Sequence, residues 1–310
     1  MRVDKFQIDV ATGRFTLPVV ILVCLFLWIV SIREWSDLVS LGIVAAICYL
    51  MIEANTSFTL IRTRTTLPVC MYAFLASSLF FLHSFGVGNW APLAFLLAVT
   101  QLFYSFESST ASIPIFHSFF FLSLGSFAFP QMAYFCPLFL LGMIPFRSMG
   151  AKTFVAALLG LLTPYWFLFG YAFWFNQMSL FYAPLVKMIY FHPIEYGHLM
   201  LNEILSWGII ALLLVIGSVH YWQTAYMDKT RTRIYHSFLT VVGLFALLFS
   251  VLQPKFLHEW MQMQLICASF LMGHLFTLTR NRFSGILFIV TFVVLILLSL
   301  YNLWMQFFSF

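Results

Sequence analysis

The chain has 310 residues, of which 63% are hydrophobic and only 8% are charged. Because an ordinary soluble domain carries roughly a quarter charged residues, this composition excludes a water-soluble globular protein, a disordered or fibrous chain and a nucleic-acid-binding protein. The formal net charge of +5 needs no acidic partner, since basic residues accumulate on the cytoplasmic side of membrane proteins.

Uncharged stretches give the expected membrane crossings, because a helix needs roughly 20 mostly apolar residues to cross a bilayer. We predict an all-α fold, a polytopic transmembrane helical bundle that forms a single domain over residues 1–310. About eleven crossings are expected, at 15–32 and 38–52, two within 65–106, two within 108–146, one in 153–186, and one each in 204–227, 234–254, 260–279 and 283–310.

The first crossing follows a polar, basic leader over residues 1–14. It is longer than the apolar core of a typical signal peptide, and no Ala-x-Ala cleavage site follows it. We therefore interpret it as an uncleaved anchor in a bacterial inner (cytoplasmic) membrane, with a eukaryotic membrane as the alternative.

The first outer loop places two carboxylates, Glu34 and Asp37, beside Arg33. A carboxylate here can act as a base on an acceptor hydroxyl, or bind a metal that neutralises a leaving phosphate. The arrangement faintly resembles the membrane-embedded glycosyltransferases that use polyprenyl-phosphate sugars, which carry an acidic residue in this loop. That resemblance implies that Glu34 and Asp37 are catalytic. The alternative is an interfacial turn with an ion pair and a helix cap.

The second loop, from Asn55 to Pro68, reads NTSFTLIRTRTTLP. It is similar to a signature in a family of uncharacterised polytopic inner-membrane proteins of Bacteroidota. The resemblance implies a membrane location and no activity. Arg62 and Arg64 are predicted to face phosphate headgroups, and Pro68 is suited to the first turn of the next helix.

Residues 176–202 form the longest predicted outer-side interfacial segment. His192, Glu195 and His198 are candidate ligands of one divalent metal, since imidazole and carboxylate suit such ions. This interpretation supposes that Pro193 opens a helix. The alternative is an amphipathic helix lying at the membrane surface, with no metal.

Loop charges orient the predicted bundle. With eleven crossings the N-terminus is cytoplasmic and the C-terminus periplasmic. The inner side then holds twelve of the fifteen Lys and Arg residues, as the positive-inside rule requires: Arg2, Lys5, Arg14, Arg62, Arg64, Arg147, Lys152, Lys229, Arg231, Arg233, Arg280 and Arg282. The outer side holds Arg33, Lys187 and Lys255.

Four histidines, His117, His220, His236 and His274, are expected one to two turns inside the cytoplasmic helix ends. Intramembrane ionisable groups are candidates for function, so these four could form a headgroup or phosphate site with Arg62 and Arg64, or a proton relay. The alternative is that each is a structural histidine, which is inexpensive to bury because it is neutral near pH 7.

Three functions fit these features. The first is an enzyme of envelope glycan assembly that binds a polyprenyl-phosphate carrier. The second is a non-catalytic subunit or scaffold of an envelope complex, with a protein partner in the membrane. The third is a transporter of lipid or small solutes. The sequence identifies no cofactor, and the expected ligand is membrane lipid.

Overall fold

The computed structural model describes residues 2–279 and 281–308, and the side chains of residues 6–279 and 281–306. Helices make up 81% of the structure, and no strand occurs in the described residues. The chain divides into two compact units. The first unit comprises Met1–Phe85 and Glu195–Phe310, and the second comprises Gly86–Ile194.

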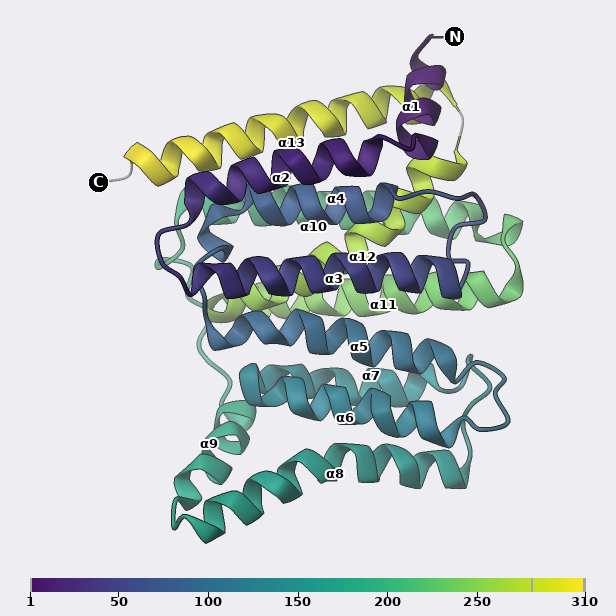
Figure 1. Ribbon diagram of the computed structural model, residues 1–310. Helices are drawn as coiled ribbons and strands as arrows, with labels where there is room; N and C mark the ends of the chain where they lie inside the picture. Colours follow the sequence, from purple (N-terminus) through teal and green to yellow (C-terminus); the bar gives the residue numbers. More distant parts are fainter. Residues whose placement is uncertain (1, 280, 309–310) are drawn as a thin grey trace. The chain divides into compact units, whose positions relative to one another are not determined.

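The first unit is built around one central helix, α12 (Leu257–Leu278), which packs against α4, α10 and α11 (Figure 1). Every side chain of α12 from Met263 to Thr277 is buried, as expected for a helix with neighbours on all sides. The other helices of this unit are α1 (Arg2–Thr12), α2 (Thr16–Ser31), α3 (Asp37–Ser57), α4 (Leu67–Ser78), η1 (Phe80–Leu82), α10 (Leu201–Thr224), η4 (Ala225–Met227), α11 (Thr230–Leu252), η5 (Pro254–Phe256) and α13 (Arg282–Phe308).

Small and polar side chains allow these helices to approach closely. A Cβ atom on Gly217 of α10 would lie only 2.9 Å from the Cβ of Leu271 on α12. Gln264 of α12 donates to the carbonyl of Ala246 (3.1 Å) and to Ser250 Oγ (2.9 Å) on α11. Close backbone approach and interhelical hydrogen bonds are the usual means by which membrane helices associate.

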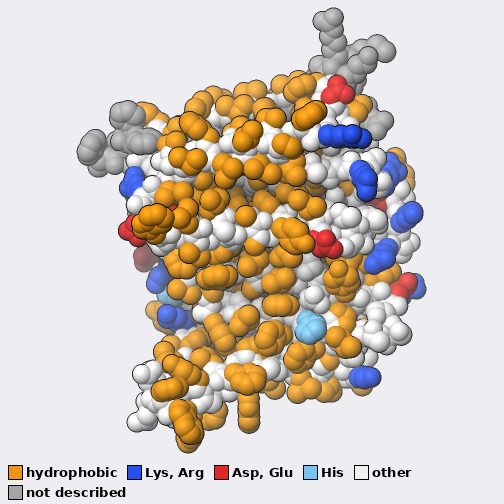
Figure 2. Space-filling view, viewed as in Figure 1, with side chains coloured by type: hydrophobic (Ala, Val, Ile, Leu, Met, Phe, Trp, Pro, Cys, Tyr) orange, Lys and Arg blue, Asp and Glu red, His pale blue; other side chains and the backbone are white. Residues whose placement is uncertain are grey.

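The flanks of α2 and α3 carry large exposed apolar side chains, and Figure 2 shows hydrophobic side chains covering this face. Leu22, Phe26 and Ile29 on α2 are each more than half exposed. A soluble protein rarely exposes so large a contiguous apolar surface. We therefore interpret these flanks as the lipid-facing surface of the first unit.

The second unit is held together by α6, which packs on both α5 and α8. Glu107 and Arg147 form an exposed ion pair of 2.7 Å, and Tyr134 Oη donates to the carbonyl of Met188 at 2.6 Å, which fixes the end of α9. The elements of this unit are η2 (Val87–Trp90), α5 (Ala91–Tyr104), α6 (Ser112–Ala128), η3 (Pro130–Tyr134), α7 (Phe135–Gly142), α8 (Ala151–Trp174) and α9 (Met178–Ile189).

Seven of the described helices are long and apolar enough to cross a membrane, and the bent pair of α1 and α2 would be an eighth. The protein is therefore an all-helical, multi-pass membrane protein, as predicted. Each of the eleven predicted crossings contains a helix, although α4, α6 and α7 are shorter than a crossing requires. The number of eleven and the orientation of the termini stay predictions. Arg280, which enters the charge count, lies outside the described residues.

One expected element is absent. The helix predicted to begin at Pro193 does not form. Residues 190–200 contain no helix, and α10 begins only at Leu201. Proline is compatible with the first turn of a helix but does not by itself start one. Gly197 then adds backbone freedom that disfavours a regular helix. Within the predicted interfacial segment 176–202, the helical parts are α9, upstream of the histidines, and the first two residues of α10.

Candidate functional site

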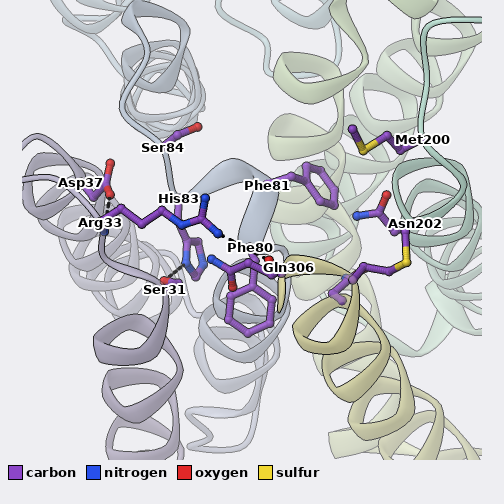
Figure 3. Close-up of a pocket in the computed structure, with 12 residues that line it drawn as sticks. Ser31, Arg33, Asp37, Phe80, Phe81, His83, Ser84, Met200, Asn202 and Gln306 are labelled. Atoms are coloured by element: carbon purple, nitrogen blue, oxygen red, sulfur yellow. Dashed lines mark hydrogen bonds between the residues drawn. The ribbon is translucent and has the colours of Figure 1, made fainter. Parts of the chain in front are cut away.

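A cavity of about 320 Å³ lies at one end of the first unit, and we call it the Asp37 cavity (Figure 3). Four segments meet there: the turn between α2 and α3, the turn after α4, the start of α10 and the end of α13. Its volume is in the range of sites that bind small ligands. The lining residues are Ser31, Arg33, Asp37, Phe80, Phe81, His83, Ser84, Met200, Asn202, Asn302, Met305 and Gln306.

The Asp37 carboxylate holds the turn between α2 and α3 in shape. Its Oδ2 atom accepts hydrogen bonds from the backbone amides of Arg33 (3.0 Å) and Glu34 (3.1 Å). The Asp37 side chain is buried, whereas Glu34 is exposed and accepts a hydrogen bond from Ser36 Oγ. Of the two predicted catalytic carboxylates, the structure therefore places Asp37 at the cavity and Glu34 outside its lining.

Arg33 supplies positive charge at the cavity. Its side chain extends over His83 toward the end of α13, where Nη2 donates weakly to the carbonyl of Gln306 at 3.4 Å (Figure 3). Among the described residues, the three ion pairs do not include Arg33. The expected ion pair of this turn is thus missing, and the exposed guanidinium retains donors that can bind an anion.

His83 closes the inner wall of the cavity. Its ring stacks on Trp28 with centroids 3.7 Å apart, and Nε2 lies 3.2 Å from the carbonyl of Ala76. Because a carbonyl only accepts, Nε2 carries the hydrogen. Nδ1 lies against Ser31 Oγ, which also contacts the carbonyl of Trp28 at 3.0 Å. Burial lowers the pKa of His83 to about 4, although the Ala76 carbonyl and Asp37 act in the opposite direction. The imidazole is therefore neutral at pH 7.

Three amide side chains give the cavity its chemistry. The side-chain oxygens of Asn202, Asn302 and Gln306 are buried and have no hydrogen-bond partner. Asn302 is only 2% exposed, and its Nδ2 donates to the carbonyl of Ser78 (3.0 Å) and to Ser206 Oγ (3.1 Å). These two hydrogen bonds fix the orientation of the Asn302 amide, and its Oδ1 atom is left without a donor. Buried acceptors without donors are costly, so the cavity is suited to a ligand that brings hydroxyl groups.

The predicted metal ligands do not form a centre. The described residues contain no group of three or more His, Cys, Asp or Glu side chains that could hold a metal ion. Glu195 and His198 are exposed, and His192 is half-buried with its ring 4.8 Å from that of Tyr190. Since the helix expected at Pro193 is absent, the spacing argument that grouped these three residues no longer holds.

The predicted histidine cluster forms in part, at the opposite end of the first unit. His236 and His274 are buried with ring centroids 4.8 Å apart. His274 Nε2 pairs with Asp228 Oδ2 at 2.8 Å, and His236 Nε2 donates to the carbonyl of Leu60 at 3.0 Å. Burial by itself would raise the pKa of Asp228, but the hydrogen bond and charge of His274 hold that pKa below its ordinary value.

The remaining predicted headgroup residues have different surroundings. His220 Nε2 lies 2.8 Å from Oγ1 of Thr279, the C-cap residue of α12. His117 is exposed on α6 of the second unit. Arg62 and Arg64 are exposed in the loop between α3 and α4, where they line a second and larger cavity.

Compared with known protein families, curated proteins and solved structures, the chain matches none of them. The residues of the Asp37 cavity that sequence reasoning missed are mainly its amides. A usable signal was present, because Asn302 lies in α13, the most apolar of the seven described helices that are long enough to cross a membrane. A polar side chain inside such a helix is a candidate for function. The meeting of Asn302 with Asn202, one hundred residues away, has no sequence signal.

Proposed function

We propose that the protein binds the headgroup of a polyprenyl-phosphate-linked glycan in the Asp37 cavity, as a component of bacterial envelope assembly. One observation carries this proposal: three buried amide oxygens without donors surround a cavity that has a guanidinium beside it. Sugar hydroxyls are the donors that these amides lack, and Arg33 is suited to the phosphate. Phe80 and Phe81 offer aromatic surface against a sugar ring.

The lipid chain of such a ligand needs an apolar path out of the cavity. α2 and α13 both end at the cavity and expose apolar flanks along their length. Leu22 and Phe26 on α2, with Val290 and Leu297 on α13, provide surface of this kind. A polyprenyl tail lying on these flanks stays in the bilayer while the headgroup occupies the cavity.

The orientation that we propose places this cavity on the periplasmic side, where envelope glycans are assembled. Within the first unit, Arg14, Arg62 and Arg64 lie at the end opposite the cavity, and Arg33 lies at the cavity end. We propose eleven crossings with the N-terminus in the cytoplasm and the C-terminus in the periplasm, and the separation of charge supports this sidedness for the first unit. The location that we propose is the bacterial inner membrane.

A catalytic step remains a separate part of the proposal. Asp37 is the better candidate base or metal ligand, because its buried carboxylate lines the cavity, whereas Glu34 is exposed and lies outside the lining. If the protein is an enzyme of envelope glycan assembly, Asp37→Asn is expected to abolish that assembly in cells. The matched control, Glu34→Gln, is expected to preserve it. Full activity of Asp37→Asn would limit the protein to binding.

Native mass spectrometry of the protein extracted with its own lipid tests the binding itself. We expect the wild type to retain a polyprenyl-phosphate species, and Arg33→Gln combined with Asn202→Leu to lose it. Gln264→Leu is the matched control, because it removes a buried amide of the same unit that lies outside the cavity. Retention of ordinary phospholipid alone together with a stoichiometric protein partner would refute the proposal and favour a scaffold.

A further inference from the structure

The chain bends by 80° between α1 and α2, and this bend creates a second cavity that we call the elbow cavity. Gly13 lies at the bend. A Cβ atom on Gly13 would lie 2.4 Å from the carbonyl oxygen of Asp9 and 2.8 Å from Thr16 Oγ1, so the turn accepts no larger residue without moving. The bend between α1 and α2 is therefore fixed at Gly13, beside the loop between α3 and α4.

The elbow cavity has a volume of about 840 Å³ and is strongly basic. Arg14 comes from the bend, and Arg62 and Arg64 come from the loop between α3 and α4. No Asp or Glu is among the described residues that line it, and no ion pair of the described residues includes these three arginines. The positive charge of Arg62 helps to lower the pKa of Asp228, but Asp228 lies outside the lining of the cavity. The cavity thus presents unneutralised guanidinium groups.

Hydrogen bonds from neighbouring helices hold the loop in shape before any ligand binds. Thr65 Oγ1 donates to the carbonyl of Ala11 at 2.6 Å and accepts from the amide of Leu67 at 3.1 Å. Asn55 Nδ2 donates to the carbonyl of Thr65 at 3.1 Å, and His236 occupies the carbonyl of Leu60. The carbonyls of Leu60 and Thr65 are therefore engaged by protein donors, which fixes the two ends of the segment that carries Arg62 and Arg64.

The loop begins with a sharp change of backbone direction. Thr59 lines the cavity with φ at 49°, in the left-handed region, directly after Phe58, the C-cap of α3. A left-handed residue at this position commonly ends a helix, and here it turns the chain into the loop that carries Arg62 and Arg64.

Two buried polar atoms in the lining lack partners. Thr63 Oγ1 has no hydrogen-bond partner, although its hydroxyl can donate to an anion, and Asn55 Oδ1 has no donor. The opposite wall is apolar and includes Leu17, Ile52 and Val69. The cavity therefore offers cationic groups and a hydroxyl donor for a phosphate, an acceptor for a headgroup hydroxyl, and apolar surface for an acyl chain.

We propose that the elbow cavity binds one anionic glycerophospholipid, with its phosphate held by Arg14, Arg62, Arg64 and Thr63 and its headgroup hydroxyl held by Asn55. This site is independent of the proposed function, since it lies at the other end of the first unit. Phosphatidylglycerol has the required phosphate and hydroxyls. Phosphatidylcholine has the phosphate, but its cationic headgroup is repelled by the arginines and offers no hydroxyl.

The test is a titration of the purified full-length protein in mild detergent, read by native mass spectrometry. We expect one phosphatidylglycerol molecule to bind at a single tight site, and phosphatidylcholine to bind much more weakly. The double variant Arg62→Gln with Arg64→Gln is expected to weaken this binding at least tenfold, in line with the attraction of two basic side chains to anionic lipid. Thr63→Val, which removes only the hydroxyl, is expected to weaken it severalfold.

The matched control is Lys229→Gln with Arg233→Gln, which also removes two positive charges, here near the start of α11. Thr232 Oγ1 lies 3.4 Å from the carbonyl of Thr59, so these charges occupy the same end of the unit without lining the cavity. Equal loss of binding in both double variants would overturn the proposal in favour of diffuse surface attraction. Binding of inorganic phosphate that phosphatidylglycerol does not displace would overturn the lipid assignment and leave a free-phosphate site.

Discussion

Acid should destabilise the protein through His83 in particular. His83 is 2% exposed, stacked on Trp28, and neutral in the folded state because burial lowers its pKa to about 4. In the unfolded chain the pKa is that of an ordinary histidine, 6.5. Above pH 6.5 both states are neutral and the histidine causes no pH dependence. As the pH falls from 6.5 toward 4, the unfolded state binds a proton at His83 but the folded state does not, so the free energy of unfolding falls.

The size of the effect follows from the difference between the two pKa values. A shift of one unit corresponds to about 1.4 kcal/mol, so the free energy of unfolding is expected to fall by about 3 kcal/mol across this window. That loss is a large fraction of the stability of a typical protein. Below about pH 4 the folded state is protonated as well, and this contribution stops changing.

The assay is unfolding in detergent at a series of pH values, followed by tryptophan fluorescence. His83→Phe keeps an aromatic ring against Trp28 but cannot titrate, so its stability should change much less between pH 6.5 and 4. His117→Phe is the matched control, because it removes an exposed histidine of the second unit and should preserve the wild-type pH dependence. Identical pH dependence in the wild type and in His83→Phe would refute the reasoning.

Three further predictions concern the first unit, and each is checked by unfolding measurements in detergent. Gln264→Leu should lower the free energy of unfolding by about 1–2 kcal/mol, because two interhelical hydrogen bonds to α11 are lost; an unchanged value would show that they contribute nothing. Gly217→Leu should cost about 1–3 kcal/mol through overpacking against Leu271, and Gly217→Ala less. Asp228→Asn should remove a stabilisation that the wild type has above the ordinary carboxyl pKa of 3.8 and loses as the pH falls through the lower folded value. That assignment fails if the variant retains the wild-type pH dependence below pH 3.8.

The class of the fold follows from the amino-acid sequence alone, because the cost of placing charge in a bilayer limits where charged residues occur. Each predicted crossing contains a helix, and residues 153–186 hold most of α8 and of the separate helix α9. The same reasoning failed at Pro193, where a single proline was expected to open a helix. The preference of a single residue determines the start of a helix only weakly, since a helix also needs helix-forming residues after its first position.

The candidate site was predictable only in its local parts. Asp37 could be proposed because it follows the first crossing directly, and Arg62 and Arg64 because they lie in a short basic turn. The pairing of His274 with Asp228 and the meeting of Asn202 with Asn302 depend on which helices surround α12, and packing between distant segments leaves no mark in a single sequence. Hydrophobicity therefore determined which residues enter the membrane, whereas the close packing of helices decided which buried polar groups find partners and which remain free for a ligand.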